Sequence, residues 1–230
     1  MTRWSRALER LRALRRDTSA LAYVEFAYML PILMALGLGG IELGNLAITH
    51  MRVSQIALSL ADNASRAKQK VATGLPRLRE TDINQSLTAA QLQAGGLDLK
   101  THGRLILSSL EKNADGGQWI HWQRCSGDKS YASSYGVQGD GATGTGKTGM
   151  GPAGKQVAAD TGFAIMFVEV AYDYQPIIFG SLFGPQEIKK TAAMYVRDDR
   201  DLTGDTTKAA KYGNVYNPAP TVPDSQIGFC

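Results

Sequence analysis

A chain of 230 residues with 43% hydrophobic and 20% charged residues has room for one folded domain and a membrane anchor, and it is too apolar for an intrinsically disordered protein. The formal net charge of +4 resides in residues 1–20, where six arginines accompany two acidic residues, whereas residues 21–230 carry equal numbers of basic and acidic side chains. A neutral body excludes the electrostatic binding to nucleic acid that depends on counterion release.

The basic segment 1–20 directly precedes residues 21–49, an apolar run without Lys, Arg or Asp. Its charge-free part, Phe26–Ile41, contains 16 residues. As a helix this part is about 24 Å long, which is shorter than the roughly 30 Å of a hydrocarbon core. A spanning helix must therefore include flanking residues, which places Glu25 and Glu42 near opposite interfaces, where a carboxylate costs less than at the centre. The arginines before the run predict a cytoplasmic N-terminus and an exported body.

Two other interpretations of the apolar run remain open. A cleaved secretory signal has an apolar region of about 7–15 residues, which is shorter than this run. Ser59-Leu60-Ala61 nevertheless offers a small-x-small match for signal cleavage. A buried core helix of a soluble protein can be equally apolar, although a basic prefix of this length is unusual before one.

Two glycines in the apolar run are spaced for contact with another helix. Gly40 and Gly44, in Gly40-Ile41-Glu42-Leu43-Gly44, have the GxxxG spacing that allows close approach of a second helix. We therefore predict a helix-packing site at Gly40, Glu42 and Gly44. Glycine is also frequent in membrane helices without such a role, and this remains the alternative.

The order of residues around Glu25 resembles a type IV prepilin processing site: a basic leader, a small residue, four residues, Glu, Phe and a long apolar helix. A cut between Ala20 and Leu21 would make Glu25 the fifth and Phe26 the sixth residue of the mature chain. Several segments of the chain are similar to the TadE family, the pseudopilin-like proteins of the tight-adherence (Tad) pilus machinery. The segments are Val24-Glu25-Phe26-Ala27 with Leu30-Pro31, Gly40 to Gly44, Trp122-Gln123-Arg124-Cys125, and Phe167 to Pro176.

The resemblance implies a role in assembling or anchoring a pilus from the bacterial inner membrane, with the N-terminus cytoplasmic and the C-terminal domain periplasmic. The implied partners are the lipid bilayer, other pilin-like subunits, Tad assembly proteins and a prepilin peptidase that acts on the leader. The family more often has Gly where this chain has Ala20. Independently of the resemblance, a carboxylate at the membrane edge prefers a cationic partner. The α-amine that cleavage creates at Leu21 would offer one to Glu25 of a neighbouring subunit, and snorkelling of Glu25 to the interface is the alternative.

Beyond the apolar run the pattern predicts helices first and strands afterwards. Apolar residues with i, i+3, i+4 spacing continue the first helix outward, and Gly74-Leu75-Pro76 interrupts it. A second helix is predicted at Asp82–Ala94, capped by Asp82 and ended by Gly95-Gly96. The residues of the helical pattern are Val53, Ile56, Ala57, Leu60, Ala61 and Ala64; the predicted strands are Arg104–Leu110, Gln118–Arg124, Phe163–Tyr174 and Ile188–Arg197.

This order predicts an α+β fold in which a long helix packs on an antiparallel sheet, which is also the pilin-like arrangement. The predicted organisation is a basic leader (1–20), a transmembrane helix (21–49), a pilin-like domain (50–200) and a polar, extended tail (201–230). A Gly- and Ser-rich loop is predicted at 126–160.

The two cysteines, Cys125 and Cys230, do not form a CxxC pair. In an exported domain they can form one disulfide that ties the C-terminus to the body. Two unpaired thiols remain the alternative, because the sequence does not supply the Cα separation that a disulfide requires.

Three segments match chemical motifs without the context that the motifs need. Gly141–Thr148 satisfies GxxxxGK[ST], but a phosphate-binding loop requires a strand before it and a helix after it. His121 and Cys125 on one strand are about 13 Å apart, too far to share a zinc ion. The start of an EF-hand-like pattern at Asp199 has Ala210 where the loop requires a bidentate acid. The sequence thus predicts a protein that is not an enzyme, with no cofactor, metal or nucleotide; a membrane-anchored periplasmic enzyme or ligand-binding domain is the alternative.

Overall fold

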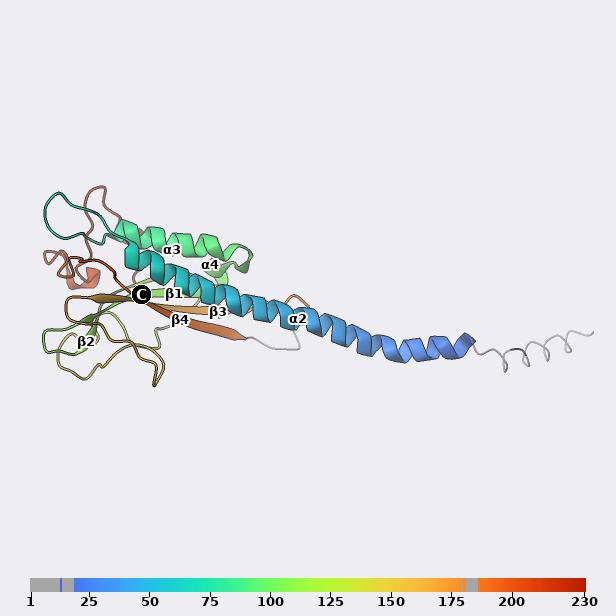
Figure 1. Ribbon diagram of the computed structural model, residues 1–230. Coiled ribbons are helices and arrows are strands. Elements are labelled where there is room, and N and C mark those ends of the chain that lie inside the picture. The colour runs from blue at the N-terminus through green and yellow to red at the C-terminus, as the bar shows by residue number, and fades with distance from the viewer. Residues whose placement is uncertain (1–12, 14–18, 179, 181–185) are drawn as a thin grey trace, which may run out of the picture. The chain divides into compact units, whose positions relative to one another are not determined.

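The computed structural model describes residues 13, 19–178, 180 and 186–230, and its fold class is α+β, as predicted. Most of the predicted basic leader, residues 1–12 and 14–18, lies outside the described residues. The chain divides into two units, residues 1–46 with 176–179, and residues 47–175 with 180–230. The elements are α2 (Ser19–Arg66), α3 (Glu80–Ala94), η1 (Gly95–Leu97), α4 (Leu99–His102), β1 (Gly103–Lys112), β2 (Gln118–Ser126), β3 (Ala164–Asp173), β4 (Glu187–Tyr195), η2 (Ala210–Tyr212) and η3 (Asp224–Gln226) (Figure 1).

The described strands form one antiparallel sheet in the order β2-β1-β3-β4. All four coincide with predicted strands to within two residues at each end. β1 and β2 pair with a register shift, because Ser109 lies opposite Trp122 whereas Leu110 lies opposite Ile120. His121 is therefore an extra residue on β2 and forms a β-bulge. At this bulge the side chains of His121 and Trp122 depart from the regular alternation between the two faces of the sheet.

The C-terminal half of α2 and helix α3 cover one face of the sheet (Figure 1). Leu107 lies opposite both Arg124 and Val168 in the register, so these three share a face. Arg124 binds Glu80 of α3, which identifies this as the helix-covered face. The residues predicted for the inner stripe of α2 are all buried to 2% exposure or less: Val53, Ile56, Ala57, Leu60, Ala61 and Ala64.

Helix α3 begins two residues before the predicted start, which corrects the role assigned to Asp82. Asp82 is the third residue of the helix, and its carboxylate accepts the backbone N–H of Arg79 at 3.0 Å in a capping box. The Asp82 carboxylate pairs with the Arg79 guanidinium at 2.7 Å, and this hydrogen bond is the main reason that the pKa of Arg79 is raised. Gly95 ends the helix with a φ of +53°, a conformation that suits glycine.

The opposite face of the sheet is covered by the predicted irregular loop. Residues 127–163 are all described and contain no helix or strand beyond the bridge between Met150 and Val157. The loop nevertheless contributes Met150 and Ala159 to a core with Leu110, Ile120, Ile165 and Phe167. Its sequence predicts the irregular backbone, but its role as the second layer of the domain follows only from the structure.

The tail 201–230 packs on the domain, which its polar composition did not predict. Val215, Val222 and Ile227 are at most 9% exposed. Cys125 donates its backbone N–H to Gly228 at 2.6 Å, and Cys230 forms a disulfide with Cys125. A few apolar residues at irregular spacing suffice for this packing, and they leave no periodic pattern in the sequence.

Candidate functional site

Helix α2 presents an apolar surface that the rest of the described chain does not cover. It is the one described helix long and apolar enough to cross a membrane, and no residue of its most apolar 18-residue window is buried. Leu21 is 59%, Phe26 58% and Leu36 69% exposed. A core helix of a soluble protein would bury such side chains, so the structure argues against that interpretation.

The second half of α2 argues against a secretory signal that ends at Ala61. Val53, Ile56, Leu60 and Ala61 are at most 1% exposed and belong to the core of the α+β domain. Cleavage after Ala61 would remove them and uncover the sheet. Since each large apolar side chain contributes about 1.5–3 kcal/mol on burial, the domain would lose more than its usual margin of stability.

The residues of the predicted processing site lie at the start of α2. Ala20 and Leu21 both fall within the helix, so the bond expected to be cleaved is helical in the structure. Leu21, Glu25 and Phe26 are exposed. From Leu21 onward, this part of the helix is exposed.

Gly40 and Gly44 form an open strip on α2, but Glu42 does not belong to it. A methyl group added at either glycine would meet no described atom within 4 Å. Both positions are exposed, whereas Glu42 is 3% exposed and lies on another side of the helix. The helix-packing set predicted from the sequence therefore reduces to the two glycines.

Glu42 is held by a segment far away in the sequence. Its Oε2 accepts the backbone N–H of Ile177 at 3.1 Å and that of Ile178 at 2.9 Å. These residues follow Pro176, directly after β3, and belong to the same unit as the first part of α2. This contact was not predicted from the sequence. Two sequence features could have indicated it: the acid inside the apolar helix and the uncharged residues that follow Pro176.

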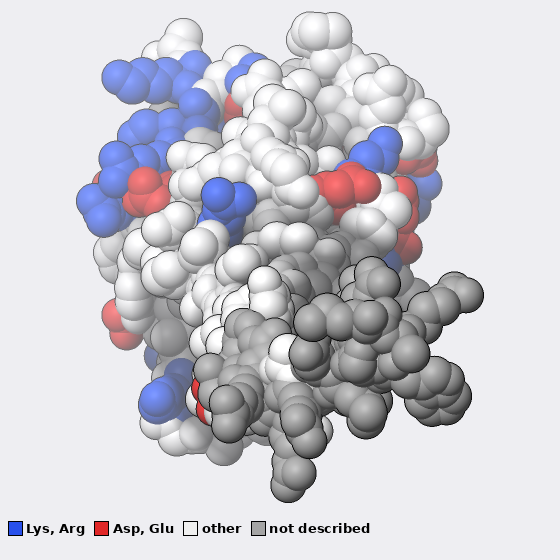
Figure 2. All heavy atoms as spheres, turned by 90° about the vertical axis from the view of Figure 1, so that its right-hand side faces the viewer, with Lys and Arg blue, Asp and Glu red and all other residues white. Residues whose placement is uncertain are grey.

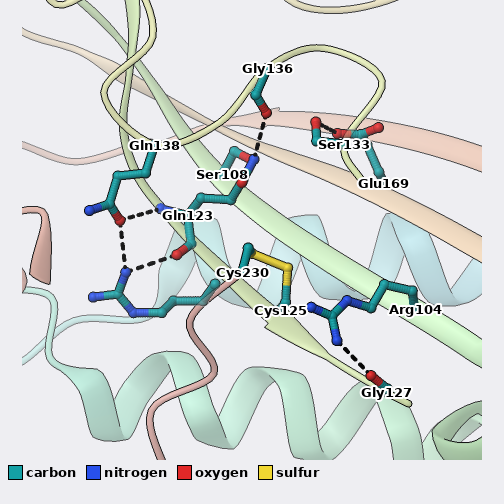
Figure 3. Close-up of a disulfide and its surroundings, with 11 residues drawn as sticks. Arg104, Ser108, Gln123, Cys125, Gly127, Ser133, Gly136, Gln138, Glu169 and Cys230 are labelled. Carbon is teal, nitrogen blue, oxygen red and sulfur yellow. Dashed lines mark hydrogen bonds between the residues drawn. A yellow bond between two sulfur atoms is a disulfide. The ribbon is translucent and has the colours of Figure 1, made fainter. Parts of the chain in front are cut away.

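The disulfide between Cys125 and Cys230 closes a loop over 105 positions, with the two Cα atoms 5.1 Å apart. Figure 3 shows it on the loop-covered side of the sheet, near Gln123 and Arg104. Gln123 donates to Ser108 at 2.9 Å and to the carbonyl of Gly136 at 3.1 Å. The disulfide and these bonds tie β2, the loop and the tail together.

A buried carboxylate holds the loop from the neighbouring strand. Glu169 on β3 is 2% exposed and accepts the hydroxyl of Ser133 (Figure 3). It also accepts the backbone N–H of Ser134 at 2.9 Å and the hydroxyl of Tyr131 at 3.5 Å. Burial raises the pKa of Glu169, and these hydrogen bonds oppose the increase. The side chain is buried, and its hydrogen bonds organise the loop.

The nucleotide-binding motif Gly141–Thr148 lacks the architecture of a phosphate cradle. All residues around it are described; the segment before it is irregular, and no helix follows. The amine of Lys147, which would contact phosphate, donates instead to the carbonyl of Tyr135 at 2.7 Å. The motif forms part of the loop layer.

A chain of polar side chains, Ser109, Glu111 and His121, lies buried at the bulge. The carboxylate of Glu111 accepts Ser109 Oγ at 2.7 Å and contacts His121 Nδ1 at 2.9 Å. A nucleophilic relay requires the hydroxyl to bond to the imidazole, and here it bonds to the carboxylate. The adjoining cavity of about 20 Å³ also reaches Arg200, whose pKa is lowered by burial. It has room for about one water molecule and none for a substrate.

The described residues contain no group of three or more His, Cys, Asp or Glu side chains that could hold a metal ion. The two residues considered for zinc have other partners. His121 contacts Glu111, and Cys125 is in the disulfide. Comparisons of the chain with protein-family models, with curated proteins and with solved structures gave no match.

Proposed function

We propose that this chain is a non-catalytic pilus-assembly protein of the pseudopilin kind, similar to the TadE proteins of the Tad (Flp) pilus system, acting through helix–helix and domain contacts. The observation that carries the proposal is the double character of α2. Its first half is apolar and uncovered, and its second half supplies the core of an α+β domain. A helix of this kind couples a bilayer-embedded packing surface to a folded domain, which is what lateral assembly of pilin-like subunits requires.

The proposed location is the bacterial inner membrane, crossed once, with the basic leader in the cytoplasm and the domain in the periplasm. Six arginines precede the span, and positive charge is retained on the cytoplasmic side. The disulfide between Cys125 and Cys230 supports export, since disulfides persist in oxidising compartments and are rare in the cytosol.

The proposed partners are lipid and protein surfaces. Gly40 and Gly44 would admit a second helix at close range, and Glu25 would pair with the new α-amine of a neighbouring subunit once a prepilin peptidase has cut after Ala20. Nucleic acid is not among the proposed partners. On the face seen in Figure 2, basic side chains are most numerous at the upper left, and acidic side chains lie among the basic ones on both sides.

The alternative, a membrane-anchored enzyme or ligand-binding domain, is favoured by one observation, the buried chain of Ser109, Glu111 and His121. Its geometry supports a structural role better. The three residues are between 1% and 6% exposed, so no substrate reaches them without unfolding of the region. A serine that donates to a carboxylate is also not activated for attack.

The mass of the intact protein purified from membranes tests the proposal. A mature chain that begins at Leu21 supports prepilin-type processing, whereas one that begins at Asp62 contradicts the proposal. Glu25→Ala is expected to impair leader removal or pilus assembly, because it removes the one carboxylate near the new N-terminus of the span. Leu36→Ala, at another exposed position in the same helix, is the control and is expected to leave both unchanged.

A further inference from the structure

Glu42, which binds the backbone of Ile177 and Ile178, lies within the apolar surface of α2. Glu42 sits among apolar side chains that face outward, because Ile41 is 56% and Leu43 60% exposed. The sequence has no Lys, Arg, Asp or Glu between Glu42 and Arg52. The lipid-compatible surface therefore continues past Glu42 and does not end at it.

The length of the span leads to the same conclusion. The charge-free part from Phe26 to Ile41 falls about 6 Å short of a hydrocarbon core, so the bilayer boundary lies near or beyond Glu42. A bare carboxylate at such a depth is costly. Two backbone N–H donors, at 2.9 and 3.1 Å, replace part of its hydration.

The two donors must lie at the depth of the carboxylate that they bind. Ile177 is 66% exposed in spite of this anchoring, so its side chain points away from the protein. Exposure of this isoleucine to water is unfavourable, and its transfer to lipid lowers the free energy by about 25 cal/mol for each Å² of apolar surface removed from water. The sequence from Pro176 to Pro185, Pro-Ile-Ile-Phe-Gly-Ser-Leu-Phe-Gly-Pro, contains no charged residue, which is compatible with such a location.

We infer that Pro176–Ile178 is a second membrane contact, which rests in the lipid interface beside α2 and is fixed there by Glu42. An irregular backbone is tolerated at this depth because Glu42 satisfies the N–H groups of Ile177 and Ile178. The occupant of the exposed Ile177 surface is the acyl and headgroup region of the bilayer. This inference rests on the proposed membrane span.

Three variants of the full-length protein, each with one added cysteine, test it in phosphatidylcholine vesicles. Ile177→Cys probes the loop, Leu36→Cys the span and Val137→Cys the domain surface; Leu36 and Val137 are 69% and 56% exposed. The native cysteines are joined in the disulfide, so each variant has one reactive thiol. Because the donors to Glu42 are backbone groups, the substitution at position 177 preserves them. Each thiol is labelled with an environment-sensitive fluorophore and exposed to lipids that carry a spin-label quencher.

The expected result is a blue-shifted, strongly quenched emission at positions 36 and 177 and an unquenched emission at 137. Quenching at 36 without quenching at 177 overturns the inference and leaves the span intact. An unquenched position 36 instead overturns the span on which the inference depends. Adding Glu42→Ala is expected to reduce the quenching at 177 while leaving that at 36 unchanged. No change at 177 would show that Glu42 does not hold the loop.

Discussion

Glu80 and Arg124 lie 44 positions apart in the sequence and form an ion pair in which both side chains are completely buried. Arg124 Nε donates to Glu80 Oε2 at 3.1 Å, and Nη2 donates to Oε1. The same guanidinium also donates to the carbonyl of Tyr212 at 2.8 Å. The pair thereby joins α3, β2 and the tail in the interior of the domain.

Removing one partner of this pair should strongly destabilise the domain. Glu80→Ala leaves a guanidinium buried without its counter-charge, and we expect a loss of about 3–5 kcal/mol in the free energy of unfolding. Urea denaturation of the full-length protein in detergent, followed by near-ultraviolet circular dichroism, measures it. The control is Glu187→Ala, which removes a carboxylate from partly exposed pairs with Lys189 and Lys129 and should cost at most about 1 kcal/mol for each pair. Equal losses in the two variants would contradict the structural role of the buried pair.

The packing of α2 on the sheet predicts a contrast between two leucines of the same helix. Leu60 is fully buried and Leu58 is 47% exposed. Leu60→Ala should destabilise the domain by about 2–5 kcal/mol through lost burial and a residual cavity. Leu58→Ala should change it by no more than about 0.5 kcal/mol. Thermal unfolding of the two variants measures the difference, and similar midpoints would mean that the outer part of α2 is not part of the core.

The disulfide should contribute to stability through the long loop that it closes. Cys230→Ser is expected to cost about 2–5 kcal/mol and to expose the tail to proteolysis. Cys125→Ser should have a similar effect, and the double variant should add little, because the first change already removes the bond. Thiol counting on protein isolated under non-reducing conditions provides the independent check. Two free thiols in that preparation would refute the pairing.

The raised pKa of Glu169 predicts a pH dependence of a definite sign. Burial favours its protonated form, so the folded state binds the proton more tightly than the unfolded state does. Stability from this group is therefore present below the ordinary glutamate pKa, near 4.5, and decreases as the pH rises through the raised value. Glu169→Gln should flatten this decrease. A wild-type profile that falls no more steeply than that of the variant would contradict the assignment.

The local elements could be predicted from the sequence because local patterns determine them. The stripe from Val53 to Ala64 repeats at helical spacing, and Gly95 ends α3 at the predicted place. The turn-rich residues 113–117 likewise separated the two strands predicted where β1 and β2 lie. The start of α3 was misplaced because Asp82 suits two positions of a helix N-terminus, the cap and the third residue.

The contacts that organise the site could not be predicted, because they join residues far apart in the chain. Glu42 finds its donors 135 and 136 positions away, and Glu169 binds Ser133 from 36 positions away. The acid inside the apolar run marks Glu42 as unusual, but it does not indicate which distant segment binds it. The two cysteines, by contrast, could be named as a possible pair because no other cysteine competes with them.

The central claim is that residues 21–49 cross the membrane and place the domain on the far side from the arginines. Labelling of Val137→Cys with a membrane-impermeant maleimide tests it most directly, since this position is exposed on the domain and the native cysteines do not react. The account predicts labelling in intact spheroplasts and protection in sealed inverted vesicles of the inner membrane. Labelling in the inverted vesicles and protection in spheroplasts would contradict it.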